Sequence, residues 1–241
     1  MPGKLTVIGV GPGDPELLTL KGLRILKAAK CIFVPKGREE GSSLALSIIS
    51  GLIDLSGKEV VEAYFPMRKT RGPNQSHCCG DLDEQWRNTV DGVFSRLKSG
   101  MDVVFITIGD PTVYSTFYYL QERLLDLAPD MEIEIVPGVS SITASAARAG
   151  IYLGIADERI AVLPANYMAD LGDTFQRFDT IVLMKVNKVF EQIRQKLNEA
   201  GLAGKAVYVA RAGMEDEKIF HSLDKVTDKD LNYFSMVIVK K

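Results

Sequence analysis

The strongest constraint on the fold is an alternation along the chain between short apolar runs and longer segments with helical spacing. The short runs are rich in β-branched residues, which favour strands, and the segments between them are long enough for crossover helices. Strands joined by crossover helices pair in parallel. The first 138 residues therefore predict an α/β domain with a mostly parallel sheet, whose strands lie in residues 5–10, 31–35, 59–65, 102–109 and 132–138.

The alternation restarts after residue 138 with a segment of small residues, 139–150. Strand-like runs then follow at residues 159–164, 179–186, 205–213 and 234–240. The connection before the last run is short and polar, so we expect that strand to be antiparallel to its neighbours. The sequence thus predicts a second α/β domain with a mixed sheet, and we divide the chain into residues 1–140 and 141–241.

A glycine-rich turn follows the first predicted strand and resembles a phosphate-binding loop. A dinucleotide-binding turn has the spacing G-x-G-x-x-G, but here the glycines are Gly9, Gly11 and Gly13, so the third comes one residue early. Pro12 and Pro15 also lack the N–H groups that would bind a phosphate. No Gly-Lys-Ser/Thr sequence follows, which excludes a P-loop. We therefore expect this turn to serve another purpose.

The segment after this turn predicts a helix over residues 15–30, with leucines near helical spacing. Asp14 is a good N-cap for it, and Pro15 suits the first helical position. Asp14 therefore has a structural explanation that needs no ligand.

Composition limits the class of protein. The chain has 241 residues, 46% of them hydrophobic and 25% charged, and a formal charge of −2, so its net charge does not predict nucleic acid or membrane as a partner. Three cysteines, Cys31, Cys78 and Cys79, are few and odd in number, which favours a reducing compartment over a disulfide framework. The chain begins without a signal-peptide pattern, and we expect a cytoplasmic protein.

Four predicted strands end in glycine or proline with small polar residues: "GVGPGDP", "TIGDPTVYST", "VPGVSS" and "RAGMEDE". Ligands of open α/β sheets bind at the carboxyl ends of the strands, so four such turns together favour a binding site, although each alone could be only a tight turn. No basic side chain accompanies these turns before Arg211. Their backbone groups and small polar side chains suit a neutral or cationic, adenosine-like ligand; these side chains are Asp110, Ser115, Thr116, Ser140 and Ser141.

The segments "VIGVGPGDPELLTLKG", "GDPTVYSTF" and "VPGVSS" resemble the tetrapyrrole methylases, which use S-adenosylmethionine, and "LMKV" and "RAGMEDEKIF" extend the resemblance over nearly the whole chain. Within this family, "YFPM", Trp86 and "YFSMVIV" are most similar to the branch that methylates C20 of precorrin-2 or cobalt-factor II in cobalamin biosynthesis. The resemblance implies a homodimer of two-domain subunits, with the cofactor in the cleft between the domains.

The resemblance also implies which residues form the site. The residues matched to the S-adenosylmethionine site are Pro12, Ile108, Gly109, Asp110, Val113, Ser140, Ser141, Met184, Ala212, Gly213 and Phe234. Those matched to the tetrapyrrole site are Gly11, Gly13 and Tyr114. No general base for the loss of a proton from C20 can be named, and no metal is expected.

Several residues have competing structural interpretations. Met184 lies in an apolar strand and could be core, Asp110 before a proline could only begin a turn, and Arg211 could be a solvated cation. If residues 112–120 form a helix, Tyr114 and Tyr118 lie one turn apart and face either the macrocycle or the core.

Three alternatives remain for the function. The chain could methylate another corrinoid position or a different acceptor, or it could bind nucleotide or tetrapyrrole without catalysis.

One segment, "SHCC", with His77, Cys78 and Cys79, departs from the family pattern. These three side chains could ligate a metal ion, but adjacent cysteines do not easily ligate one tetrahedral ion, so we expect a surface loop there.

Overall fold

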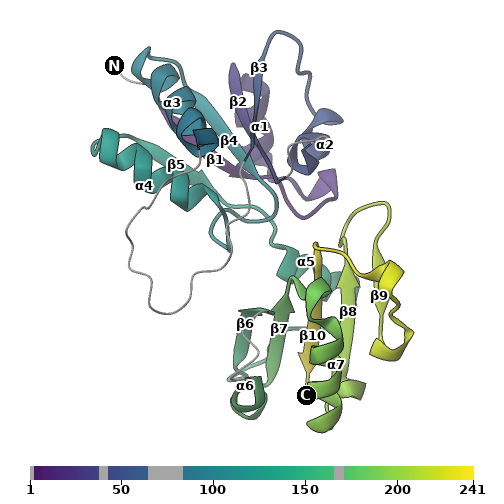
Figure 1. Cartoon of the computed structure of the whole chain (residues 1–241). Coiled ribbons are helices and arrows are strands. Elements are labelled where there is room, and N and C mark those ends of the chain that lie inside the picture. Colours follow the sequence, from purple (N-terminus) through teal and green to yellow (C-terminus); the bar gives the residue numbers. More distant parts are fainter. Residues whose placement is uncertain (1–2, 38–42, 65–83, 166–170) are drawn as a thin grey trace. The chain divides into compact units, whose positions relative to one another are not determined.

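The computed structural model describes residues 3–37, 43–64, 84–165 and 171–241 (Figure 1). It divides into two compact units, Met1–Val139 and Ser140–Lys241, and each is described by itself. No helix within the described ranges is long and apolar enough to cross a membrane.

The N-terminal unit is built on a five-stranded sheet in which every strand pairing is parallel. The alternation in the sequence predicted this parallel pairing, and the structure gives the strand order as β3-β2-β4-β1-β5. The strands are β1 (Leu5–Gly9), β2 (Cys31–Lys36), β3 (Glu59–Tyr64), β4 (Val103–Thr107) and β5 (Ile133–Val136). Because β4, β1 and β5 are neighbours, the turns that follow these three strands meet at one edge of the sheet.

Helices cover both faces of this sheet (Figure 1). Alternate residues of each strand point to opposite faces, so Val7 packs in one hydrophobic cluster and Ile8 in the other. The cluster around Val7 includes α3 (Glu84–Lys98) and α4 (Phe117–Leu127). The cluster around Ile8 includes α1 (Leu20–Ala28) and α2 (Leu44–Ser50).

The helix predicted over residues 15–30 is broken into two pieces. Asp14 does cap a helix, as expected, but this is the single 3-10 turn η1 (Pro15–Leu17), where its carboxylate accepts the Glu16 N–H at 2.9 Å. The chain then extends through Leu18, whose side chain is buried, and α1 begins after Thr19, which accepts the Gly22 N–H at 3.1 Å. Burial of Leu18 and the second cap override the helical spacing of the leucines.

The C-terminal unit has a mixed five-stranded sheet of order β6-β7-β10-β8-β9. Its strands are β6 (Ile160–Pro164), β7 (Thr180–Met184), β8 (Ala206–Ala210), β9 (Lys218–Phe220) and β10 (Ser235–Lys240). β10 is antiparallel to both β7 and β8, as predicted, although not for the expected reason. β9 is also antiparallel to β8, so β9 and β10 run in the same direction on either side of β8, and two short 3-10 turns, η4 (Leu223–Lys225) and η5 (Asp228–Asp230), lie in the connection between them. β9 was not predicted from the sequence, because it is only three residues long.

The helices of this unit are α5 (Ser141–Arg148), α6 (Leu171–Arg177) and α7 (Phe190–Glu199), with further 3-10 turns η2 (Val186–Lys188) and η3 (Ala203–Lys205). α6 and α7 pack with one face of the sheet in a single hydrophobic cluster. Tyr208 of β8 is fully buried in that cluster, with its ring edge-on to Phe190 at 5.4 Å, and its hydroxyl donates to the Asp230 carbonyl at 2.8 Å.

Candidate functional site

The glycine-rich turn after β1 packs against the turns after β4 and β5. A Cβ on Gly9 would lie 2.5 Å from the carbonyl oxygen of Gly109 and 2.7 Å from the nitrogen of Gly138. A Cβ on Gly138 would overlap the same Gly109 oxygen. Glycines are required here because three backbone segments approach one another more closely than side chains allow.

Gly11 and Gly109 form a two-way backbone bridge between the first and second of these turns. The Gly109 N–H donates to the Gly11 carbonyl at 2.7 Å, and the Gly11 N–H donates back at 3.4 Å. Both residues have positive φ, +82° and +71°, a conformation that favours glycine. Pro12 is buried and Gly13 is half-buried beside this bridge. The structure therefore brings Gly11, Pro12 and Gly13 next to the Gly109–Asp110 turn.

Asp110 joins the β4 turn to the β5 turn. One carboxylate oxygen accepts the Gly138 N–H at 3.0 Å, and the other accepts the Thr112 N–H at 2.7 Å and the Thr112 hydroxyl. The interpretation of Asp110 as a turn-forming residue is therefore confirmed. Ile108 and Val113, on either side of it in the chain, are half-buried.

Tyr114 is not a core residue, because 49% of its surface is exposed. The expected helix over residues 112–120 is also wrong: α4 begins at Phe117, and Tyr114 has a positive φ of 52°. Tyr114 and Tyr118 are therefore not on successive turns of one helix. Pro111 before the segment and the Ser115 hydroxyl, which accepts the Phe117 N–H at 3.2 Å, favour a turn there.

A second group of candidate residues lies at one edge of the C-terminal sheet. β10 runs antiparallel between β7 and β8, so its start adjoins the ends of both. The Lys185 N–H donates to the Ser235 carbonyl at 2.8 Å, and the Arg211 N–H donates to the Phe234 carbonyl at 2.7 Å. Lys185 and Arg211 both have positive φ, 61° and 54°, an unusual conformation for side-chain-bearing residues that often accompanies functional sites.

Met184, Ala212, Gly213 and Phe234 are brought together at this edge. Met184 is half-buried, so it is only partly core, and Phe234 is 38% exposed. Ala212 is buried, and Gly213 has a φ of +77°. Arg211 is not a free solvated cation, because its guanidinium forms an ion pair with Asp216.

Ser140 and Ser141 stand at the start of α5. Ser140 is its N-cap, and its hydroxyl accepts the Ile142 N–H at 3.2 Å. The hydroxyl of Ser140 thus has a structural role beside the one implied by the family resemblance.

The comparison with protein families decides the class. Residues 4–226 match the model of the tetrapyrrole (corrin/porphyrin) methylases. The chain belongs to this family.

Two curated relatives of this methylase cover almost all of it. The probable cobalt-precorrin-2 C(20)-methyltransferase of Methanocaldococcus jannaschii is 39% identical over 99% of this chain and 96% of its own. The cobalt-precorrin-2 C(20)-methyltransferase of Salmonella typhimurium is 35% identical over 100% of this chain and 98% of its own. A solved uroporphyrin-III C-methyl transferase from Thermus thermophilus, complexed with S-adenyl homocysteine, shares the fold: its TM-score is 0.69 at 23% identity, over 99% of this chain and 92% of its own.

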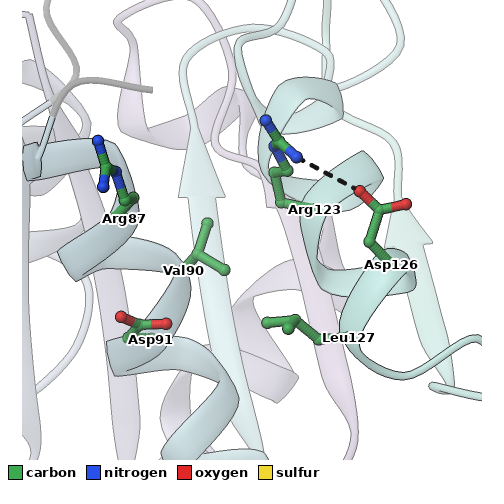
Figure 2. Close-up of a pocket in the computed structure, with 6 residues that line it drawn as sticks. All are labelled: Arg87, Val90, Asp91, Arg123, Asp126 and Leu127. Atoms are coloured by element: carbon green, nitrogen blue, oxygen red, sulfur yellow. Dashed lines mark ion pairs between the residues drawn. The ribbon is translucent and has the colours of Figure 1, made fainter. Parts of the chain in front are cut away.

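A cavity of about 280 Å³ opens between α3 and α4 of the methylase, and Figure 2 shows the six residues that line it. Arg123 and Asp126 form an ion pair there with an N–O distance of 3.6 Å. None of the candidate site residues lines this cavity. The other lining residues are Arg87, Val90, Asp91 and Leu127.

Three residues that were not predicted for the site form contacts within the C-terminal group: Lys185, Arg148 and Glu217. Glu217 was part of the quoted turn "RAGMEDE", but nothing in the sequence distinguishes it from Glu215 and Asp216. His77, Cys78 and Cys79 lie outside the described residues.

Proposed function

We propose that this methylase transfers a methyl group from S-adenosylmethionine to C20 of precorrin-2 or cobalt-factor II in cobalamin biosynthesis. The observation that carries the proposal is the similarity to two C20-methyltransferases over nearly the whole of each chain. The turns that the family resemblance assigns to the site are all present in the described residues, and each is held by specific backbone contacts.

The side chains and backbone groups at the candidate edge of each sheet fit S-adenosylmethionine. The C-terminal edge offers partly exposed apolar side chains, Met184 and Phe234, on which an adenine ring can pack. The N-terminal edge offers backbone groups around Gly109 and no basic side chain between Ile108 and Thr116, which suits a cationic sulfonium ligand. We propose that the residues that the resemblance assigned to the cofactor are the ones that hold it.

The bound cofactor supplies an electrophilic methyl group on sulfur, so the protein need not activate it further. The main tasks of this chain are then to align the methyl group with the acceptor carbon and to exclude water. The Gly11–Gly109 bridge and the Asp110 carboxylate suit these tasks, because they fix the β1, β4 and β5 turns relative to one another.

The tetrapyrrole is proposed to contact the glycine-rich turn and Tyr114. Gly11 and Gly13 present backbone without side chains, so a large planar molecule can approach closely. Tyr114 is half-exposed next to the same turns and offers an aromatic surface for the macrocycle.

We also propose a homodimer, as the resemblance implies. Sedimentation analysis of the purified protein tests this oligomeric state.

The test is an assay with S-adenosylmethionine labelled with ¹³C in its methyl group, with precorrin-2 and its cobalt form as separate acceptors. Carbon NMR of the product should locate one labelled methyl at C20. The comparison of the two acceptors shows which is preferred. A label at another ring carbon would support a different corrinoid position, and cofactor binding without transfer to either acceptor would refute the proposal.

A further inference from the structure

Glu217 lies at the centre of a hydrogen-bonded group in the C-terminal unit. Its side chain is only 10% exposed. Oxygen Oε2 accepts the Gly213 N–H at 2.7 Å. The Nε of Arg148 lies 2.8 Å from Oε1 and 2.9 Å from Oε2, and its Nη2 lies 2.7 Å from Oε1. One carboxylate therefore holds a backbone amide and a guanidinium at the same time.

This carboxylate links two segments that are distant in the sequence. Gly213 belongs to the turn between β8 and β9, where φ is positive, and Arg148 is the last residue of α5, 69 residues from Glu217. Figure 1 draws α5 at the end of the sheet where β7 and β8 finish, in agreement with this ion pair. α5 begins at Ser140 and Ser141, so Glu217 joins the helix that carries these serines to the turn that carries Ala212 and Gly213.

The ion pair contributes to the placement of α5, together with the burial of Ile142 and Ala144 on the same helix. Arg–carboxylate pairs with more than one hydrogen bond fix geometry as well as energy, and loss of the Arg148 side chain would leave the largely buried Glu217 carboxylate without its ion-pair partner. Arg148 also lies at the C-terminus of α5, where a cation is favourable.

The contact also limits how the β8–β9 turn can bind a ligand. The Gly213 N–H already donates to Glu217, so it is not free to donate to the cofactor. The turn therefore contributes the shape of its backbone rather than this amide. That shape depends on Glu217, since Gly213 and Glu217 are the two ends of the closed turn.

We infer that Glu217 is a positioning residue for S-adenosylmethionine, fixing the β8–β9 turn and α5 relative to each other. The inference rests on the proposed function, which assigns Ser140, Ser141, Ala212 and Gly213 to the cofactor. It predicts that loss of the Glu217 carboxylate harms cofactor binding selectively, while the interaction with the tetrapyrrole is kept.

The test compares Glu217→Ala, Glu217→Gln and Arg148→Ala with Glu215→Ala, a control at an exposed acid of the same turn. The dissociation constant for S-adenosylmethionine is measured by calorimetry, and KM for the tetrapyrrole by steady-state assay. Glu217→Ala should raise the dissociation constant for S-adenosylmethionine about tenfold or more, the effect expected for a lost charge-assisted hydrogen bond. The KM for the tetrapyrrole should stay unchanged. Glu217→Gln should restore part of the affinity, because the amide oxygen can still accept the Gly213 N–H.

The outcomes separate this inference from the proposed function. If the wild-type protein does not bind S-adenosylmethionine, the proposed function fails. If the wild type binds it and folded Glu217→Ala binds equally well, or loses cofactor and tetrapyrrole affinity in parallel, Glu217 is not a positioning residue for the cofactor. If Glu217→Ala does not fold, wild-type affinity in both Glu217→Gln and Arg148→Ala overturns the inference.

Discussion

Asp110 and Gly138, 28 residues apart, are joined by a hydrogen bond of 3.0 Å from the Gly138 N–H to the Asp110 carboxylate. The other oxygen of the same carboxylate accepts the Thr112 N–H. Two of the three turns at the carboxyl edge of the parallel sheet are thus held by one side chain. The candidate site of the N-terminal unit is consequently a set of interlocked backbones rather than a collection of separate loops.

Asp110→Ala should lower both stability and cofactor affinity. Removal of the carboxylate leaves the Gly138 and Thr112 N–H groups without their acceptor, which should cost about 1–3 kcal/mol of unfolding free energy. Chemical denaturation and calorimetric titration with S-adenosylmethionine measure the two effects, with the exposed Asp130→Ala as control. An Asp110→Ala protein with wild-type stability and affinity would show that this carboxylate contributes neither to the free energy of unfolding nor to cofactor binding.

Gly9→Ala should be strongly destabilising although it adds only one methyl group. The new Cβ would lie 2.5 Å from the Gly109 oxygen, so backbone must move, and overpacking of this kind costs about 1–3 kcal/mol or more. Gly172→Ala is the matched control, because it lies in α6 with nothing within 4 Å of the added Cβ and should be neutral or stabilising by up to about 1 kcal/mol. Thermal melting of both variants tests this, and equal melting temperatures would contradict the close approach of the three turns.

Met184→Arg should weaken S-adenosylmethionine binding. The long cation would occupy a half-buried position at the edge where the adenine ring is proposed to pack. Met184→Leu, which keeps the apolar volume, should retain most of the affinity. Calorimetric titration measures the affinity of both variants for S-adenosylmethionine. Wild-type affinity in a correctly folded Met184→Arg protein would remove this strand from the cofactor site.

Tyr114→Gly separates catalysis from stability. Glycine accepts the positive φ of this position, which offsets its greater entropy in the unfolded chain, so the free energy of unfolding should change by no more than about 1 kcal/mol. The rate of tetrapyrrole methylation should nevertheless fall, while affinity for S-adenosylmethionine is kept. Tyr152→Ala, at a tyrosine of similar exposure in the other unit, serves as control. A stable Tyr114→Gly protein that methylates C20 at the normal rate would exclude Tyr114 from the substrate site.

Acid should abolish the contribution of Glu217 to stability. Burial by itself raises the pKa of this carboxyl, but hydrogen bonds from Arg148 and Gly213 outweigh it, and the pKa lies below its ordinary value of 4.5. A carboxyl whose pKa is lowered on folding stabilises the fold above its unfolded pKa and loses that effect as pH falls through the folded pKa. The difference in melting temperature between wild type and Glu217→Gln should therefore be present at pH 7 and shrink below pH 4.5. A difference independent of pH would contradict the ion pair.

The sequence alone predicted every described strand of both sheets except β9. It also predicted the parallel pairing of the first sheet and the antiparallel direction of the last strand. The strands and the parallel pairing follow from local patterns: runs of β-branched residues, helical spacing and connections long enough for crossover helices. The motifs also led to the family, since the turns that carry the resemblance are contiguous in the chain. Even locally, burial of Leu18 broke one predicted helix and the backbone of Tyr114 prevented another from starting early.

Only the tertiary structure decided which groups hold the candidate site together. The contacts of Asp110 with Gly138 and of Glu217 with Arg148 join residues 28 and 69 positions apart, and no spacing rule relates them. The requirement for glycine at position 9 likewise arises from the Gly109 carbonyl, in the turn after a neighbouring strand. Such contacts depend on strand order and register, which place turns from distant parts of the chain at one edge. A local pattern identifies the turns, but the sheet determines which of them meet.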